Sequence, residues 1–184
     1  MEIKGPAVKS IPEFVKKNYN ARYNEWLNSL SPESRKIMAN PVYSTGWYPV
    51  KEAAVEPTEK IGLLFFKSKI EAAWESGKYS AESTLKGVYR IFIKASSPQY
   101  IISRASKVFT TYYRPCNMEV IESTDKSVLV HITEFGEPNP IVEYRIGGWM
   151  EKALELSGCK EVKVFIRKSL TKGDPVTEYS IRWN

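Results

Sequence analysis

The sequence predicts an α+β protein in which a helical N-terminal half precedes a β-hairpin, a helix and a second β-hairpin. Apolar residues recur at three- and four-residue steps up to about residue 115, and the period then changes to two residues. A helical pattern returns at 138–158, between two alternating segments. This order predicts one four-stranded antiparallel sheet with the 138–158 helix against one of its faces.

Helical periodicity and end signals divide the N-terminal half into several helices. The expected helices occupy 11–30, 32–39, 49–57 and 58–75, followed by one that Ser80 caps and one that Ser97-Pro98 opens. Gly77 is expected to stop the fourth of these helices. Pro115 is expected to end the last, because the residue before a proline disfavours the helical conformation.

Alternating residues define the strands of the C-terminal part. The expected strands are 118–123, 127–133, 161–167 and a last strand with Tyr179, Ile181 and Trp183 on its inner face. Turn-forming residues at 124–126 and 172–175 join them in pairs, so two antiparallel hairpins are predicted.

The 138–158 helix is the element around which the chain is expected to be organised. Pro140 suits its first turn, and Gly158 suits the left-handed position that ends a helix. Gly147 and Gly148 interrupt its middle at a cost of roughly 1 kcal/mol each against alanine. Such glycines indicate close approach by another backbone, and the expected neighbour is the sheet formed by the flanking strands.

Length and composition fit one globular domain, 1–184, with a helical part at 1–115 and a ββαββ part at 116–184. No apolar run approaches the roughly 20 residues of a membrane span, and the N-terminus has no apolar core of signal-peptide length. Cys116 and Cys159 fit no metal or redox spacing, so a reduced, cytoplasmic chain is expected. The net charge of +6 leaves room for an acidic partner.

Five short motifs carry a family resemblance that covers most of the chain from about Ser31 onward. They are Trp47-Tyr48-Pro49, Ser97-Pro98, Tyr112-Tyr113, Gly148-Trp149 and the closing Trp183. In this order they resemble the bacterial ligand-binding superfamily of haem-nitric-oxide-binding sensor domains and vinyl-reductase-like small-molecule-binding domains. The resemblance implies a pocket for haem or another ligand between the helices and the sheet.

Haem itself can be tested against the residues. A histidine-ligated haem needs a helical histidine facing the cavity, whereas His131, the only histidine, falls in an expected strand. The haem-binding branch of the superfamily carries a Tyr-x-Ser-x-Arg pattern that Tyr179-Ser180-Ile181-Arg182 misses by one residue. Both departures argue against haem, so a non-haem member with no cofactor is expected.

Aromatic residues at element junctions and on expected core faces are the candidate ligand contacts. They are Trp47, Tyr48, Tyr112, Tyr113 and Trp149. Aromatic walls with a few hydroxyl groups suit a pocket for a small apolar or aromatic molecule. The alternative is that these side chains fill a solid core.

A basic surface is the second candidate site. Lys86, Arg90 and Lys94 stand at four-residue steps on one expected helix face, and Arg167 lies with other basic residues near the third strand. Phosphate contacts need such patches. Glu82, four residues before Lys86, favours instead a solvated, salt-bridged helix face.

Catalytic signals are sparse. His131 would have to serve any histidine-dependent mechanism, and Cys116 fits an inert packing residue better than a nucleophile. The first hypothesis is therefore a non-enzymatic, cytoplasmic small-molecule-binding or sensing domain that signals through a protein partner or a second copy. The alternative is a module that binds nucleic acid or an acidic partner, and an enzyme ranks third.

Overall fold

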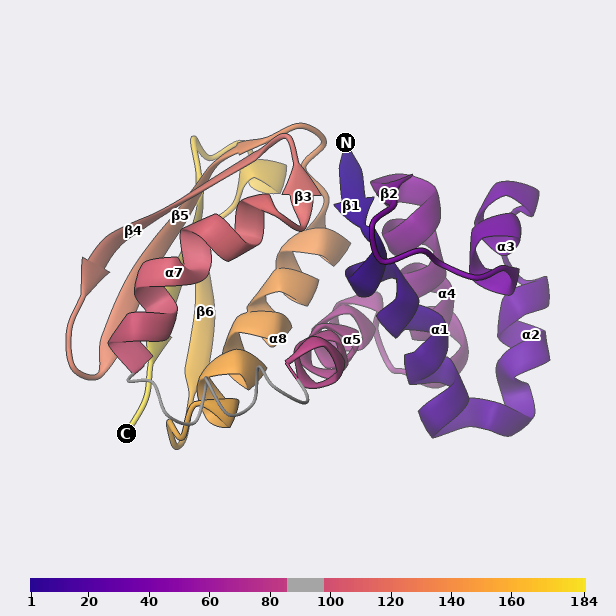
Figure 1. Cartoon of the computed structure of the whole chain (residues 1–184), viewed down its shortest axis with the longest axis horizontal. Helices are drawn as coiled ribbons and strands as arrows, with labels where there is room; N and C mark the ends of the chain where they lie inside the picture. The colour runs from indigo at the N-terminus through magenta and orange to yellow at the C-terminus, as the bar shows by residue number, and fades with distance from the viewer. Residues whose placement is uncertain (86–97) are drawn as a thin grey trace.

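The computed structural model describes residues 1–85 and 98–184. The helices are α1 (Gly5–Tyr19), α2 (Tyr23–Asn28), α3 (Pro32–Ala39), α4 (Glu56–Phe65), α5 (Lys69–Thr84), α7 (Pro98–Thr110) and α8 (Pro140–Leu156). Short helical turns at Asn20–Arg22, Lys51–Val55 and Leu170–Lys172 connect some of them. Helices α1 to α4 form one side of the molecule and a sheet forms the other, with α5 and α8 between them (Figure 1).

The large sheet contains the four strands that the alternation predicts. They are β4 (Cys116–Ser123), β5 (Ser127–Phe135), β6 (Lys163–Lys168) and β7 (Thr177–Arg182), in the spatial order β4-β5-β7-β6. Every neighbouring pair is antiparallel. Alternate residues of the central strands, such as Val130 and Ile132 in β5 and Tyr179 in β7, are buried. The predicted α+β class and the four-stranded antiparallel sheet are confirmed.

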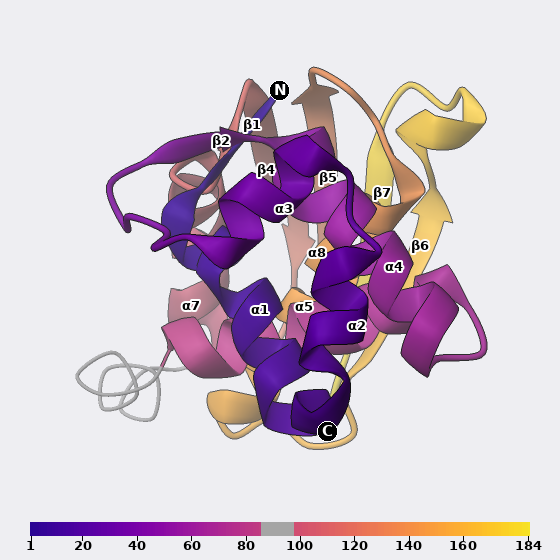
Figure 2. The same cartoon turned by 90° about the vertical axis from the view of Figure 1, so that its right-hand side faces the viewer.

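A second, smaller sheet joins the N-terminus to the start of the C-terminal part. Its strands are β1 (Glu2–Lys4), β2 (Trp47–Pro49) and β3 (Tyr113–Arg114), in the order β2-β1-β3, with both pairs antiparallel. In Figures 1 and 2, β1 lies near the N-terminus, close to the top of the large sheet. The sequence does not predict this sheet, because strands of two or three residues are too short to show alternation.

Several predicted helix ends are wrong. Gly77 does not stop a helix and Ser80 does not cap one, because both lie inside α5. The cap of α5 is Ser68, whose hydroxyl accepts the backbone N–H of Glu71 at 3.0 Å. Gly77 was expected to be a stop because its helix-breaking tendency is visible locally, whereas its packing partner is not. The remainder of the helix expected after Ser80 lies outside the described residues.

Helix α8 confirms the expected central helix, with Pro140 in its first turn and Gly158 at a φ of 103° after its end. Its glycines, however, approach a helix rather than the sheet. A side-chain carbon on Gly148 would overlap the carbonyl oxygen of Trp74 in α5. A carbon on Gly77 would overlap the carbonyl oxygen of Arg145 in α8 in the same way. The two helices therefore cross with their backbones in direct contact.

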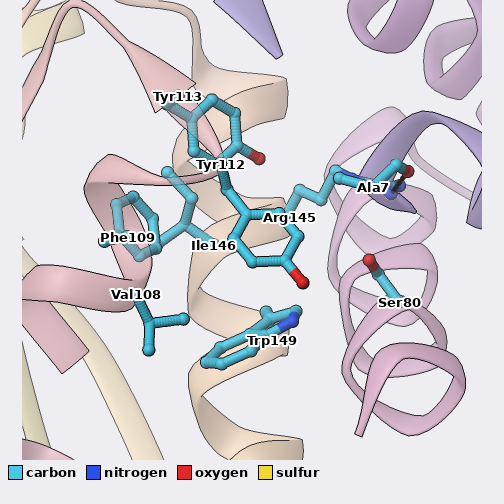
Figure 3. Close-up of a pocket in the computed structure, with 9 residues that line it drawn as sticks. All are labelled: Ala7, Ser80, Val108, Phe109, Tyr112, Tyr113, Arg145, Ile146 and Trp149. Atoms are coloured by element: carbon cyan, nitrogen blue, oxygen red, sulfur yellow. Dashed lines mark hydrogen bonds between the residues drawn. The ribbon is translucent and has the colours of Figure 1, made fainter. Parts of the chain in front are cut away.

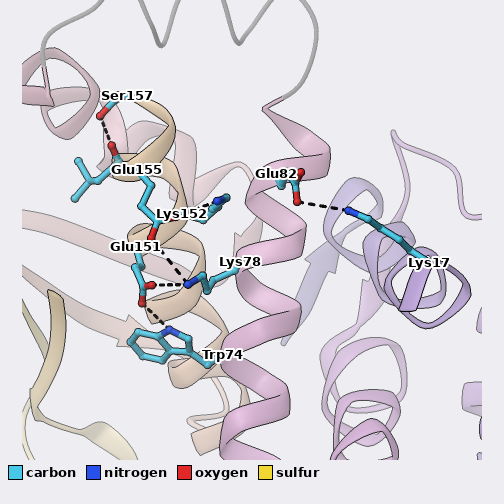
Figure 4. A network of polar contacts seen from close by, with 9 residues as sticks. Lys17, Trp74, Lys78, Glu82, Glu151, Lys152, Glu155 and Ser157 are labelled. Atoms are coloured by element: carbon cyan, nitrogen blue, oxygen red, sulfur yellow. Dashed lines mark hydrogen bonds and ion pairs between the residues drawn. The ribbon is translucent and has the colours of Figure 1, made fainter. Parts of the chain in front are cut away.

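A polar network joins the same two helices beside this crossing (Figure 4). The indole N–H of Trp74 donates to Glu151 Oε2 at 2.7 Å, and Lys78 Nζ lies 2.6 Å from Glu151 Oε1. Lys17 of α1 forms an ion pair with Glu82 of α5 at 3.7 Å. These contacts fix α1, α5 and α8 as the frame of the candidate site. No helix in the described ranges is long and apolar enough to cross a membrane.

Candidate functional site

A small cavity of about 20 Å³ lies where α1, α5, α7, α8 and β3 meet. Tyr112, Tyr113, Arg145 and Trp149 line it together with Phe109 and Ser80 (Figure 3). Its walls are largely aromatic, and Arg145 is the charged residue among those that line it. A volume of this size holds about one water-sized group.

The end of α7 places the two tyrosines. The backbone N–H of Tyr112 donates to the carbonyl oxygen of Phe109 at 2.9 Å, which closes the last turn of the helix. Tyr113 then pairs with Ile3 in the small sheet, and its ring stacks on Phe109 with centroids 5.3 Å apart. Figure 3 shows the ring of Tyr112 between Arg145 and Trp149.

Arg145 is the unusual residue of the site. Its side chain projects from α8, and the residue is 2% exposed. Nη1 donates to Ser76 Oγ at 3.0 Å, and Nη2 donates to the carbonyl oxygen of Ala7 at 2.8 Å and to Ser10 Oγ at 2.9 Å. All three acceptors are uncharged, and they belong to α5 and α1. Arg145 therefore ties both of these helices to α8.

The electrostatics of the site follow from burial. Burial lowers the pKa of the Arg145 guanidinium, and the neighbouring Tyr113 opposes that shift. Burial also raises the pKa of Tyr113 to about 12, so its phenol stays protonated. No carboxylate of the described chain forms an ion pair with Arg145. A buried charge balanced only by neutral groups is energetically costly.

A second cavity of about 40 Å³ lies between α7, α8 and the large sheet. Ile102, Val130, Met150, Leu154 and Ile181 contribute to its lining, and Trp149 lines it as well as the first cavity. None of its exposed lining is polar. The Trp149 indole therefore lines both cavities.

The structure brings together three of the five aromatic candidates, Tyr112, Tyr113 and Trp149. Trp47 and Tyr48 lie in β2, outside this cavity. The Trp47 ring lies 4.2 Å from the guanidinium carbon of Arg114, and the Tyr48 hydroxyl accepts the Tyr43 N–H at 2.9 Å. Their placement follows from the pairing of β2 with β1. The role of all five residues in ligand binding stays a prediction.

Only one of the four basic candidates, Arg167, lies in the part of the chain that the structure describes. Lys86, Arg90 and Lys94 lie outside the described residues. Arg167 lies in β6, with its guanidinium carbon 5.1 Å from the centroid of the Phe165 ring. It lines a surface groove of about 340 Å³ beside the β6–β7 connection. A basic binding surface stays a prediction.

The two residues considered for catalysis lie apart from the cavity. His131 Nε2 lies 2.8 Å from Glu178 Oε2, on the face of β5 opposite its buried residues Val130 and Ile132. Burial raises the pKa of the Cys116 thiol to about 12, which disfavours the reactive thiolate.

Sequence reasoning missed Arg145 and Glu143, the two buried charged residues of α8. Arg145 stands three residues after Val142 and four before Trp149, so it lies on the predicted apolar face. A charged residue on the apolar face of the predicted helix was the one signal in the sequence that could have identified Arg145. Glu143 accepts hydrogen bonds from the hydroxyls of Ser169, Thr171 and Thr177, which hold the β6–β7 connection.

No protein-family model matches the chain, and no curated protein matches it. Solved structures do. They include an Fe(II) unliganded H-NOX protein from K. algicida, at 12% identity and a TM-score of 0.72, covering 99% of this chain and 97% of that one. An H-NOX domain from Shewanella oneidensis in the Fe(II)CO state matches at 10% identity and a TM-score of 0.73, covering 99% of each chain. A structure from work on haem redox potential and porphyrin distortion matches at 12% identity and a TM-score of 0.70, covering 99% and 94%.

These similarities establish an H-NOX-like fold, and the predicted resemblance to that superfamily is confirmed at the level of the fold. They also correct the expectation that no cofactor is bound. Two of the similar proteins hold iron in the Fe(II) state and the third comes from work on haem redox potential, so the sequence argument against haem does not hold for this fold.

Proposed function

We propose that this chain is a small-molecule-binding sensor domain whose ligand occupies the cavity beside Arg145. One observation carries the proposal: a buried cation with only neutral partners lines a cavity walled by Tyr112 and Trp149. Ligand sites are typically apolar and aromatic, with a few polar groups that fix orientation. The H-NOX-like fold supports the same reading, since its relatives are named for the states of a bound ligand.

The position of the cavity suits a sensor. Arg145 and the residues around it connect α1, α5, α7 and α8, so an occupant would contact both the helical part and the ββαββ part. A ligand shifts a conformational equilibrium only by its differential affinity for the two states. The signal would pass to a protein partner, or to a second copy of the chain, through whichever surface differs between those states. We place the domain in the cytoplasm, where its two free cysteines stay reduced.

Haem is the cofactor that the fold suggests, and the described residues do not fit its ligation by histidine. His131 is the only histidine of the chain, and it lines neither the 20 Å³ cavity nor the 40 Å³ cavity. The side chains with oxygen at the first cavity are Tyr112, Tyr113 and Ser80, and of these tyrosine is a known haem ligand. A bound haem would supply a site for diatomic gases. The proposal for the Arg145 cavity does not depend on it.

Native mass spectrometry of freshly purified protein tests this proposal. The protein is produced in cells supplied with the haem precursor aminolaevulinate, and its absorption spectrum is recorded in parallel. We expect a non-covalent adduct that disappears on denaturation, with a Soret band if the adduct is haem. A bare polypeptide mass, with no compound in the denatured extract, would contradict the proposal.

Two matched tryptophan variants locate the adduct. Trp149→Leu removes a wall of both cavities, whereas Trp47→Leu removes an indole from the small sheet. We expect the adduct to be lost or reduced in the first variant and kept in the second. Equal retention in both variants would place the ligand elsewhere.

A further inference from the structure

We infer that the face of the large sheet that points away from α7 and α8 binds single-stranded nucleic acid, with Phe165 stacked on a base and Lys163 and Arg182 on phosphates. This site is separate from the Arg145 cavity and does not depend on the proposed function. It is carried by an exposed aromatic ring, by two adjacent cations that form no ion pair and by the groove that they line.

Alternation divides the residues of β6 and β7 between the two faces of the sheet. Val128, Val130 and Ile181 face the helices, because they line the second cavity together with residues of α7 and α8. Phe165 faces the other way, since it pairs with Ser180, the neighbour of Ile181 in β7. Phe165 is 43% exposed, so this outer face presents a large aromatic ring to solvent.

Two cations lie beside the ring on the same face. Lys163 of β6 pairs directly with Arg182 of β7, and like charges in directly opposite positions destabilise a sheet. No ion pair formed by described residues includes either of them. Residues 86–97, which the structure does not describe, contain neither Asp nor Glu. A bound anion would therefore relieve the repulsion between the two cations.

A surface groove of about 300 Å³ contains both cations and the ring. Its other lining residues are Glu161, Trp183 and Asn184. The carboxylate of Glu161 already accepts a hydrogen bond from the Asn184 side-chain amide at 2.6 Å. Arg167 adds a third cation, with its guanidinium carbon 5.1 Å from the centroid of the Phe165 ring. Clefts for small ligands begin at about this volume, so the groove has room for a nucleotide unit.

The combination of ring and cations selects the kind of anion. Phosphates bind lysine and arginine, and bases stack on exposed aromatic side chains. Bases inside a duplex are stacked on one another, so an exposed ring reaches only unpaired bases. Four-stranded sheets of RNA-recognition motifs bind single strands through aromatic residues in this way. A polyanion without planar bases, such as polyglutamate, would use the cations but not Phe165.

Fluorescence anisotropy of the wild-type protein with a fluorescein-labelled oligothymidylate of about 12 nucleotides tests the inference. Unlabelled single strand, duplex of the same length and poly-L-glutamate then compete at equal total charge. We expect binding that weakens as the salt concentration rises, and about tenfold better competition by the single strand than by the other two. Equal or better competition by the duplex or by polyglutamate would overturn the assignment. Absence of binding at low salt would also overturn it.

Two aromatic variants test the stacking. Phe165→Ala removes the ring from the groove, and Tyr43→Ala removes a ring that is 71% exposed in the helical part. We expect the affinity for the single strand to fall about tenfold in the first variant and to stay within about twofold in the second. Both side chains are exposed, so both variants should fold, which circular dichroism checks. Equal affinities of the two variants would overturn the role of Phe165.

Two lysine variants separate a phosphate contact from general attraction between charges. Lys163→Gln removes a cation from the groove, and Lys36→Gln removes an exposed cation from α3. We expect Lys163→Gln to weaken binding and to reduce the slope of log affinity against log salt by about one, whereas Lys36→Gln should leave both unchanged. Equal effects of the two variants would mean that only the net charge matters, and would overturn the assignment.

Discussion

The backbones of Gly148 in α8 and Trp74 in α5 lie so close that no side-chain carbon fits between them. Gly77 of α5 repeats this relationship with the backbone of Arg145 in α8. The two glycines thus set the separation of the helices, and the polar contact of Trp74 with Glu151 fixes their alignment. The position of Arg145, and with it the geometry of the cavity, depends on this crossing.

Gly148→Ala should lower the free energy of unfolding. Helix propensity alone would favour alanine by about 1 kcal/mol. The added methyl would overlap the Trp74 carbonyl oxygen, and overpacking of this kind costs typically about 1–3 kcal/mol. Urea melts measure the difference. Gly147→Ala is the matched control and should cost less, because its methyl meets the Trp74 ring, which can move, rather than backbone. Stabilisation by both replacements would contradict the close crossing.

Glu143→Gln should destabilise the β6–β7 connection. The Glu143 carboxylate accepts hydrogen bonds from the hydroxyls of Ser169, Thr171 and Thr177, and the amide nitrogen of glutamine cannot accept any. Leaving a buried hydroxyl without its acceptor costs about 1–3 kcal/mol. Denaturant melts would show this loss, with Glu33→Gln on the surface helix α3 as a control that should change little. Equal stability of Glu143→Gln and Glu33→Gln would show that the hydrogen bonds to Glu143 do not stabilise the β6–β7 connection.

Glu178 should give the protein a component of acid sensitivity. The hydrogen bond with His131, followed by that from Lys168, holds the pKa of Glu178 below its usual value of 4.5. A lowered pKa in the folded state stabilises the protein above the unfolded value, and this contribution disappears as the pH falls through the folded value. Wild type and Glu178→Gln should therefore differ in stability at neutral pH, and the difference should shrink below about pH 4.5 and disappear below the folded pKa. If the stability difference between wild type and Glu178→Gln stayed constant as the pH fell, the lowered pKa of Glu178 would not be its cause.

The two cysteines should react slowly with a thiol reagent in the native protein. Burial raises the pKa of Cys116 to about 12 and also raises the pKa of Cys159, so little thiolate forms near pH 8. Ellman's reagent should modify both thiols rapidly only after denaturation. Fast modification of one thiol in the native state would show that it is accessible and ionised.

The fold was largely predictable because its long elements carry strong periodic patterns. The four main strands and α8 follow from alternation and from helical spacing. Gly148 was correctly identified as a point of close approach, but its partner was not, because Trp74 is far away in the sequence and no local pattern connects the two. Gly77 was misread for the same reason, since a glycine that ends a helix and one that admits a neighbour look alike in sequence.

The site was predictable only in part. Tyr112, Tyr113 and Trp149 were singled out because aromatic residues on apolar faces are visible in the sequence. The structure brings them to one cavity, and their role in ligand binding stays a prediction. Arg145 was missed because its hydrogen-bond partners Ala7 and Ser76 are 138 and 69 residues away. A charge on an apolar helix face signals a buried polar contact, but only the folded chain identifies its neighbours.

We propose that a ligand occupies the cavity formed around Arg145 and Trp149. The NMR spectrum of the tryptophan indole N–H groups tests this during separate titrations with haemin and with the compound released from the denatured protein. Trp26, fully buried in the helical part and bonded to the Pro57 carbonyl at 3.1 Å, serves as the internal control. We expect at least one probe to shift or broaden the Trp149 signal while that of Trp26 stays unchanged. A Trp149 signal that responds to neither probe would contradict it.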